Sequence, residues 1–216
     1  MSLFFRLFAG VSMDEMDTLP LVPLGCWLFP IGIYLLVLGF GLGMDKQNRR
    51  FVIVRYGWIQ KWWNRVFLKN LLKGGFAAVG LLTLFKIIDL FVLQMFTGNR
   101  KEISVIFVLW TVHAMTLSAL FLFLETLRIK KMIPAGLLLL EGLTFLSGFH
   151  FRKSAKFMFG VWGMCVQSNL YEDMYGFSII RVMIVQITIV VACYWLGGCF
   201  FERQRNGRSL RLWKAL

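Results

Sequence analysis

Charged residues are scarce in this chain of 216 residues, and acidic ones are the scarcest. Only 16% of the residues are Asp, Glu, Lys or Arg, against about 25% in a typical soluble domain. Hydrophobic residues make up 58%, and the mean hydropathy is +0.70. These values exclude a disordered chain and an ordinary soluble domain. They predict an all-α, polytopic membrane protein, a transmembrane helix bundle.

Catalytic and metal-binding motifs are also missing. The sequence has no Walker A loop, no nucleophile elbow, no HExxH and no Gly-rich dinucleotide fingerprint. Its cysteines form no CxxC pair, so we expect small buried side chains rather than metal ligands. They are Cys26, Cys165, Cys193 and Cys199. We therefore predict that the chain is not an enzyme and holds no cofactor of its own.

Long apolar runs are what the sequence has in place of motifs. Each of five runs is about long enough to cross a bilayer as a helix, which takes about 20 residues. The predicted spans are Leu21–Gly43, Gly74–Thr97, Ile103–Leu124, Met132–Phe149 and Phe177–Phe201. A further apolar stretch, Phe157–Val166, is too short to cross.

The distribution of Lys and Arg predicts the orientation. Of the 24 basic residues, 16 lie in the segment Asp45–Lys73, the connector 128–131 and the tail 202–216. Basic residues accumulate on cytoplasmic loops, so these three segments are expected inside. Five crossings then place residues 1–19 outside, and leave 150–176 as a short outer hairpin of half-helices. The net charge of +13 needs no nucleic-acid partner to explain it.

Ionisable residues inside the predicted spans are the candidates for function, because they are costly in a membrane. They are Lys86, Asp89, His113, Glu141 and Arg181. One interpretation is structural: Lys86 and Asp89 neutralise each other one helical turn apart, and Glu141 pairs across helices with Lys86 or His113. In that interpretation Arg181 extends to the interface, and His113 is a hydrogen-bonded buried group. The competing interpretation is a metal or acid–base site.

The segment Arg49–Trp63 mixes aromatic residues with Arg and Lys. Those residue types are enriched in protein interfaces, which favours a docking surface. The alternative is a helix lying at the membrane surface, anchored by Trp58, Trp62 and Trp63. The tail of the basic stretch, Trp62–Lys73, has the amphipathic spacing of such a surface helix. Both interpretations can hold together.

The order of these features resembles a known family. CWLFP at 26–30 opens a span, and FVIVRYGWIQKWWNR follows it at 51–65. This pattern is similar to the membrane subunits of bacterial ABC-2 class ATP-binding-cassette exporters, especially the small permeases found beside bacteriocin and lantibiotic genes. The matching residues are Arg55, Tyr56, Gly57, Lys61, Trp62 and Trp63. Trp58 and Ile59 depart from the pattern.

The resemblance covers about residues 20–205 and implies an export function. In that family the segment 44–73 would be cytoplasmic and would couple to a separate ATPase subunit, which holds ATP and Mg. A second permease chain, the same or different, would complete the pathway for a hydrophobic or peptide-like substrate. The expected location is the bacterial cytoplasmic membrane, with the N-terminus outside and the C-terminus inside. The family has six spans, and residues 1–19 are too short and too acidic to supply the first.

Two other classes compete with a permease. A non-transporting integral membrane protein, acting in immunity or regulation, is favoured by the missing first span. An intramembrane enzyme would require Glu141 and His113 to face one cavity.

Overall fold

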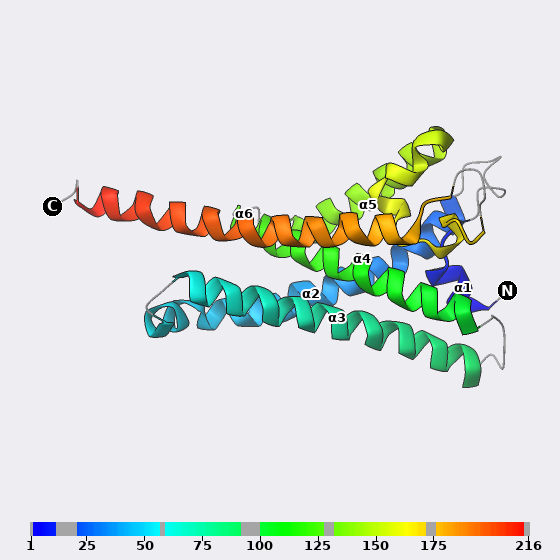
Figure 1. Ribbon diagram of the computed structural model, residues 1–216. Helices are drawn as coiled ribbons and strands as arrows, with labels where there is room; N and C mark the ends of the chain where they lie inside the picture. The colour runs from blue at the N-terminus through cyan, green and yellow to red at the C-terminus, as the bar shows by residue number, and fades with distance from the viewer. Residues whose placement is uncertain are drawn as a thin grey trace.

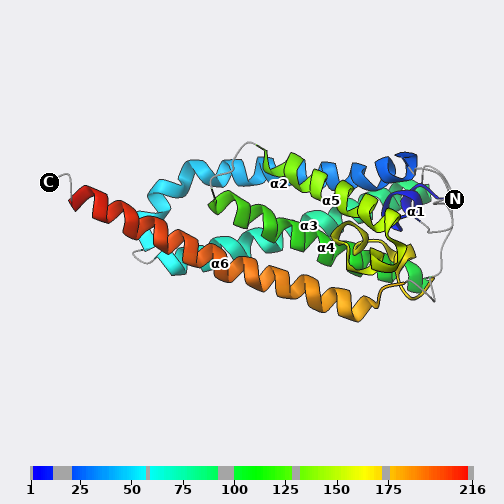
Figure 2. The ribbon, with the colours of Figure 1, turned by 90° about the horizontal axis from the view of Figure 1, so that it is seen from above.

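The chain is a bundle of long helices that run side by side (Figures 1 and 2). The computed structural model describes residues 2–11, 21–56, 59–91, 100–127, 132–171 and 176–213. It also describes their side chains, except those of 42–56, 59, 149, 152, 153 and 201–213. The helices are α1 (Leu3–Phe8), α2 (Leu21–Tyr56), α3 (Ile59–Phe91), α4 (Arg100–Thr126), α5 (Ile133–His150) and α6 (Ile179–Trp213). This architecture confirms the predicted all-α class.

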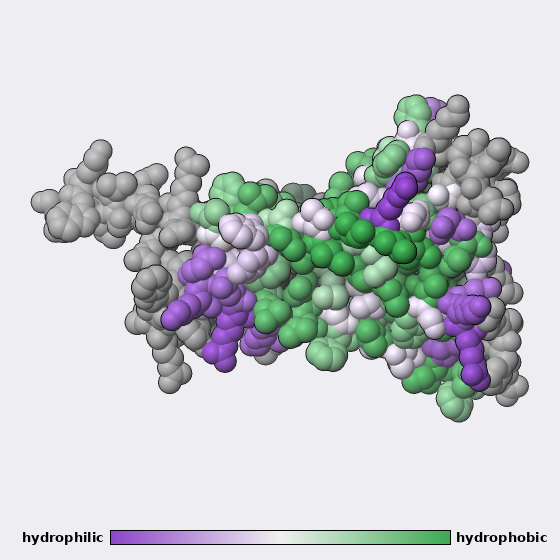
Figure 3. Space-filling model, viewed as in Figure 1, coloured by the Kyte–Doolittle hydropathy of each residue, from purple (hydrophilic) through white to green (hydrophobic). Residues whose placement is uncertain are grey.

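Four of the helices are long and apolar enough to cross a membrane. Their apolar segments are Leu21–Gly41, Gln60–Phe91, Arg100–Thr126 and Ile179–Phe200. Large apolar side chains point outward along them, with Phe40 78%, Phe76 76% and Ile180 71% exposed. Such an apolar surface is stable in lipid rather than in water. It forms the wide green band in Figure 3. The chain is therefore a membrane-embedded helical protein.

Helix α5 is the shortest member of the bundle, with an apolar segment of Ile133–Gly148. Its 18 residues make it about 27 Å long, close to the 30 Å or so of a hydrocarbon core. Pro134 lies in its first turn, where the missing proline N–H costs no hydrogen bond. The predicted span Met132–Phe149 thus corresponds to a helix of marginal crossing length.

Helix α4 lies at the centre of the bundle. In its apolar segment 61% of the residues are buried, against 17% in both α3 and α6. It contacts α2, α3, α5 and α6. Trp110 on α4 is buried against Tyr34 of α2 and Phe8 of α1, with ring centroids 5.9 and 5.2 Å apart. Polar side chains on α4 can therefore reach partners on several neighbouring helices.

The two ends of the bundle differ. One end, here the hairpin end, carries the close approach of α2 to α3, the end of α4, the start of α5 and the end of α6 (Figure 1). The opposite end, here the α1 end, carries α1, the end of α5 and the start of α6. Successive helices α2 to α6 consequently run in alternating directions.

The predicted surface segment Asp45–Lys73 is not a separate element. Helix α2 continues to Tyr56, and Trp62–Lys73 is the first third of α3. No proline or glycine lies between Asp45 and Tyr56 to end the helix. At 1.5 Å per residue, α2 is about 54 Å long, well beyond a hydrocarbon core. The predicted helix over Trp62–Lys73 is therefore present, but as the start of α3 and not as a separate helix on the membrane surface.

The predicted outer half-helices at 150–176 are also absent from the described residues. Residues 152–167 instead form three short 3₁₀ turns, η2 (Arg152–Phe157), η3 (Phe159–Val161) and η4 (Cys165–Gln167). These turns fold back over the α1 end, as Figure 2 shows. Glycines permit the close packing: a Cβ at Gly163 would lie 3.0 Å from the Trp27 ring. The prediction that Phe157–Val166 is no full crossing agrees with this geometry.

Residues 2–11 form part of the core at the α1 end, which the sequence did not indicate. Phe4 and Phe8 are completely buried. The backbone N–H of Leu3 donates to Asp89 Oδ1 at 3.0 Å, and that of Val166 donates to the Ala9 carbonyl at 2.9 Å. Gly10 has φ of +94°, where an L side chain is strained and would overlap Met164. This short segment thus closes the end of the bundle together with the 3₁₀ turns.

Candidate functional site

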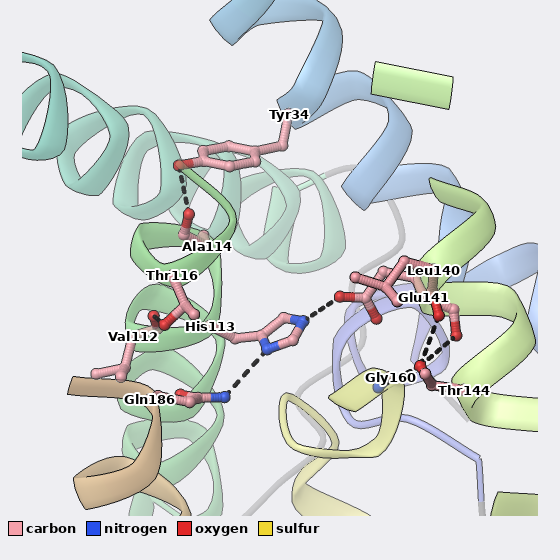
Figure 4. A network of polar contacts seen from close by, with 10 residues as sticks. All are labelled: Tyr34, Val112, His113, Ala114, Thr116, Leu140, Glu141, Thr144, Gly160 and Gln186. Carbon is pink, nitrogen blue, oxygen red and sulfur yellow. Dashed lines mark hydrogen bonds and ion pairs between the residues drawn. The ribbon is translucent and has the colours of Figure 1, made fainter. Parts of the chain in front are cut away.

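A polar network lies in the interior of the bundle, between α4, α5 and α6 (Figure 4). His113 comes from α4, Glu141 from α5 and Gln186 from α6. The His113 Nε2 atom lies 2.7 Å from Glu141 Oε1, and Gln186 Nε2 lies 3.1 Å from His113 Nδ1. All three side chains are at most 1% exposed. The imidazole therefore links two helices through its two nitrogens.

The protonation pattern of the imidazole is assigned from its two partners, with the Gln186 amide oriented so that its Nε2 faces Nδ1. The Gln186 amide N–H donates to Nδ1, so Nδ1 is an acceptor and carries no proton. The proton of a neutral imidazole then lies on Nε2 and is donated to the Glu141 carboxylate. In this state the network carries the single negative charge of Glu141. A buried charge of this kind is costly without close donors, and here the described donor is His113.

Aromatic rings and glycines enclose the network at the α1 end. The Phe159 ring lies 5.0 Å from the His113 ring, and the Trp27 ring lies 6.5 Å away, measured between centroids. A Cβ at Gly163 would come within 3.1 Å of the His113 ring. The rings surround the imidazole with apolar groups, and the low dielectric of such surroundings strengthens the imidazole–carboxylate interaction.

The turn η3 is attached to α5 beside Glu141. The Gly160 N–H donates to Thr144 Oγ1 at 2.8 Å, and the Thr144 hydroxyl donates to the Leu140 carbonyl at 2.6 Å. A Cβ at Gly160 would overlap the Glu141 carbonyl oxygen. This attachment positions the backbone that carries Glu141.

Three buried polar atoms around the network have no hydrogen-bond partner among the described residues. They are Glu141 Oε2, Gln186 Oε1 and Trp27 Nε1. Buried polar groups are nearly always hydrogen-bonded, so each such atom is unusual. The network thus has spare acceptors at both of its ends.

The other intramembrane candidates do not join this network. Asp89 is buried and accepts the Leu3 N–H, and Lys86 Nζ lies 5.2 Å from the centre of the Phe4 ring. The predicted Lys86–Asp89 pair is wrong, because both side chains contact α1 instead. Arg181 is exposed on α6, as a side chain that extends to the interface would be. Of the two partners predicted for Glu141, the structure selects His113.

The described part of the chain does not fit a metal centre. Among the described residues no group of three or more His, Cys, Asp or Glu side chains lies close enough to hold an ion. His113 and Glu141 provide only two ligand side chains, and typical zinc sites use three or four. The chemistry that the network can perform is the binding and release of a proton.

The predicted coupling residues divide into two groups. Lys61 is exposed at the hairpin end, whereas Trp62 and Trp63 are only 3% and 1% exposed. Trp63 Nε1 donates to the Tyr194 carbonyl of α6 at 2.9 Å, and its ring occupies the space beside Gly197. The two tryptophans are therefore helix-packing residues, and the prediction that they form an exposed docking surface is wrong. Arg55 and Tyr56 lie at the end of α2, with side chains outside the described set, and Gly57 lies outside the described residues.

Gln186 is the member of the network that sequence reasoning missed. Its side chain is uncharged, so a search for ionisable residues in the predicted spans does not identify it. The available signal was its position, a lone amide in the otherwise apolar run from Val182 to Ile187.

The fold and the site together define a helical membrane protein with a buried imidazole–carboxylate pair. Comparison with known proteins assigns it no narrower class. No protein-family model matches the sequence, and no curated protein and no solved structure is similar to it.

Proposed function

We propose that the chain is a membrane permease subunit of an ATP-binding-cassette exporter. A separate ATPase subunit, carrying ATP and Mg, would dock at the hairpin end and drive the movement of a hydrophobic or peptide-like substrate. In this proposal α2 to α6 make five crossings of a bacterial cytoplasmic membrane. The N-terminus is outside, the C-terminus is inside, and a second permease chain completes the pathway.

The observation that carries the proposal is the helical extension at the hairpin end. Helices α2 and α3 both continue beyond a bilayer's thickness, and this extension contains the segment that resembles the family's coupling region. Basic side chains of α3 are exposed there: Lys61, Arg65 and Lys69. A basic helical projection can receive force from a partner and transmit it into the bundle, because the helices α2 and α3 each continue from it into the apolar segments.

Site-specific photocross-linking tests the proposal. A photoreactive p-benzoylphenylalanine in place of Lys61 is irradiated in native membranes, and the purified adduct is labelled with 8-azido-ATP. The matched control carries the same group in place of Leu170, an exposed residue at the α1 end. We expect an ATP-binding adduct from position 61 and none from position 170. The absence of such an adduct at position 61, or equal adducts at both positions, contradicts the proposal.

A second candidate is a non-transporting membrane protein with an immunity or regulatory role. The burial of Trp62 and Trp63 favours it, because two of the six residues that match the family's coupling pattern are unavailable to a partner. An adduct at position 61 that 8-azido-ATP does not label would support this second candidate.

A further inference from the structure

We propose that His113, Glu141 and Gln186 form a proton-binding site inside the membrane, with His113 Nδ1 as the atom that takes up the proton. The ligand is H⁺ itself. The inference goes beyond the proposed export function and does not depend on it, since it rests only on the geometry of the network.

The first argument is charge. With the proton of His113 on Nε2, the network carries the negative charge of Glu141 in a site at most 1% exposed. Uptake of one proton makes the network an imidazolium–carboxylate pair with no net charge. A neutral pair is far less costly in a bilayer than a lone carboxylate, and its hydrogen bond is charge-assisted at both ends.

The second argument is the unused oxygen of Gln186. Protonation of Nδ1 turns it from an acceptor into a donor, so it can no longer accept from the Gln186 amide N–H. A half-turn of that amide replaces the N–H with Oε1, which has no partner among the described residues. The new bond runs from Nδ1–H to Oε1, and the bond from Nε2–H to Glu141 is kept. Both states therefore have the same number of hydrogen bonds.

The same reasoning keeps the added proton off Glu141 Oε2, the carboxyl oxygen without a hydrogen-bond partner among the described residues. A proton on Glu141 Oε2 would be a buried O–H donor, and Oε2 has no hydrogen-bond partner among the described residues. A buried donor without an acceptor loses its hydrogen bonds to water and gains none in return. The imidazole Nδ1 has an acceptor within 3.1 Å once the amide has turned.

The surroundings offer no competing charge at this site. The groups that contact the imidazole are Glu141 from α5, Gln186 from α6, Trp27 from α2 and the aromatic Phe159 with Gly163 beside it. Of these described contacts only Glu141 ionises.

The charged groups on neighbouring elements point elsewhere. On α3, which packs against α4, Lys86 and Asp89 contact α1. Arg181 of α6 and Lys156 of η2 are exposed. On α2, the Tyr34 hydroxyl donates to the Ala114 carbonyl.

Nitrogen NMR of the histidine ring tests the proposal directly, because the chain has only two histidines. The His150→Gln variant removes the exposed one and leaves His113 as the sole signal. With ¹⁵N-labelled histidine in lipid bilayers, we expect one protonated nitrogen, Nε2, in alkaline buffer. In acidic buffer we expect both nitrogens to be protonated. A ring that stays neutral in every buffer in which the protein remains folded would overturn the proposal, as would a proton on Nδ1 in alkaline buffer.

Variants of the same labelled protein test whether Glu141 is the carboxylate that pairs with the protonated His113 ring. Glu141→Gln removes the counter-charge, so the doubly protonated ring should be lost or should require a more acidic buffer. The matched control is Glu125→Gln, which alters another buried carboxylate on the same helix as His113. It should leave the transition unchanged, and equal shifts in both variants would contradict the proposal. If Glu141→Gln does not fold, Gln186→Leu serves instead, since it removes the acceptor for Nδ1 and should have the same effect.

Discussion

Glu141 places a carboxylate in the middle of an apolar helix. The hydrogen bond from the His113 imidazole lowers the free-energy cost of burying that carboxylate. The sequence identified both residues as costly groups in spans and named His113 as one of two partners for Glu141. It could not choose between His113 and Lys86, because a choice of partner depends on how helices rotate against one another. Nor could it identify Gln186, since an uncharged amide gives no signal in a search for charge.

Removal of the imidazole tests how much Glu141 depends on it. His113→Ala leaves the buried carboxylate without its donor, so we expect a loss of about 3–5 kcal/mol in the free energy of unfolding. Glu141→Gln keeps an acceptor for Nε2–H, and its loss should be smaller, on the order of 1 kcal/mol. Denaturant unfolding in detergent micelles measures both. The exposed His150→Ala is the control, expected within about 0.5 kcal/mol of the parent.

Cys165 provides a prediction for pH dependence. Burial raises the pKa of the Cys165 thiol to about 11, the negative charge of Glu102 adds to this, and a hydrogen bond with Ser168 opposes it. Because only the thiolate reacts, alkylation of the folded protein should be very slow at neutral pH and should accelerate as the pH rises toward 11. Mass spectrometry after iodoacetamide treatment measures the rate. Protein unfolded in urea should react rapidly at mildly alkaline pH, and equally rapid reaction of the folded protein would contradict this account.

At the scale of elements, apolar runs predicted where the helices are but not where they end. Helix α4 coincides with a predicted span, since hydrophobicity decides which residues enter the membrane. Helix α6 begins where its span was predicted but continues past Phe201 to Trp213. Helix α2 continues through the polar residues beyond Gly43, because no proline or glycine lies between Asp45 and Tyr56 to end it. The segment 152–167 was predicted as half-helices, but its close contacts through Gly160 and Gly163 favour tight 3₁₀ turns.

The attachment of η3 to α5 can be tested at Gly160. Gly160→Ala places a methyl group against the Glu141 carbonyl oxygen, so we expect η3 to detach at a cost of about 1–3 kcal/mol. Trypsin cleavage after the exposed Lys156 should then become faster. Gly142→Ala is the matched control on α5, because its Cβ would make only an ordinary contact with Leu28 at 3.7 Å. Equal cleavage rates in the two variants would show that η3 does not depend on this contact.

The docking of α1 depends on Asp89. Asp89→Leu removes the acceptor of the Leu3 N–H, so the amides of residues 3–8 should exchange with deuterium faster. Asp89→Asn keeps a carbonyl oxygen at the same place and should preserve most of the protection. Hydrogen exchange with mass spectrometry compares the two variants, and identical exchange in both would exclude a role for the Asp89 oxygen.

At the scale of the whole molecule, the two ends of the bundle carry different elements. The α2–α3 approach and the end of α6 lie together at the hairpin end, where the sequence had assigned its basic segments to one side of the membrane. The sequence could predict this grouping because Lys and Arg concentrate near the ends of spans, whatever the packing between the helices. The sequence could not predict that residues 2–11 pack into the α1 end, since this packing depends on the shape of the space left by α2, α3 and α4.

The proposed function depends most on α5 crossing the membrane, because the proposed five crossings would place the hairpin end in the cytoplasm and residues 150–171 outside. Labelling of single cysteines with a membrane-impermeant maleimide in intact cells tests this directly, in a variant whose four native cysteines are replaced by alanine. We predict that Leu170→Cys is labelled in intact cells and that Lys61→Cys is labelled only after the membrane is opened. Labelling of both positions from the same side would show that α5 does not cross, and would contradict the five-span topology and the proposed docking end.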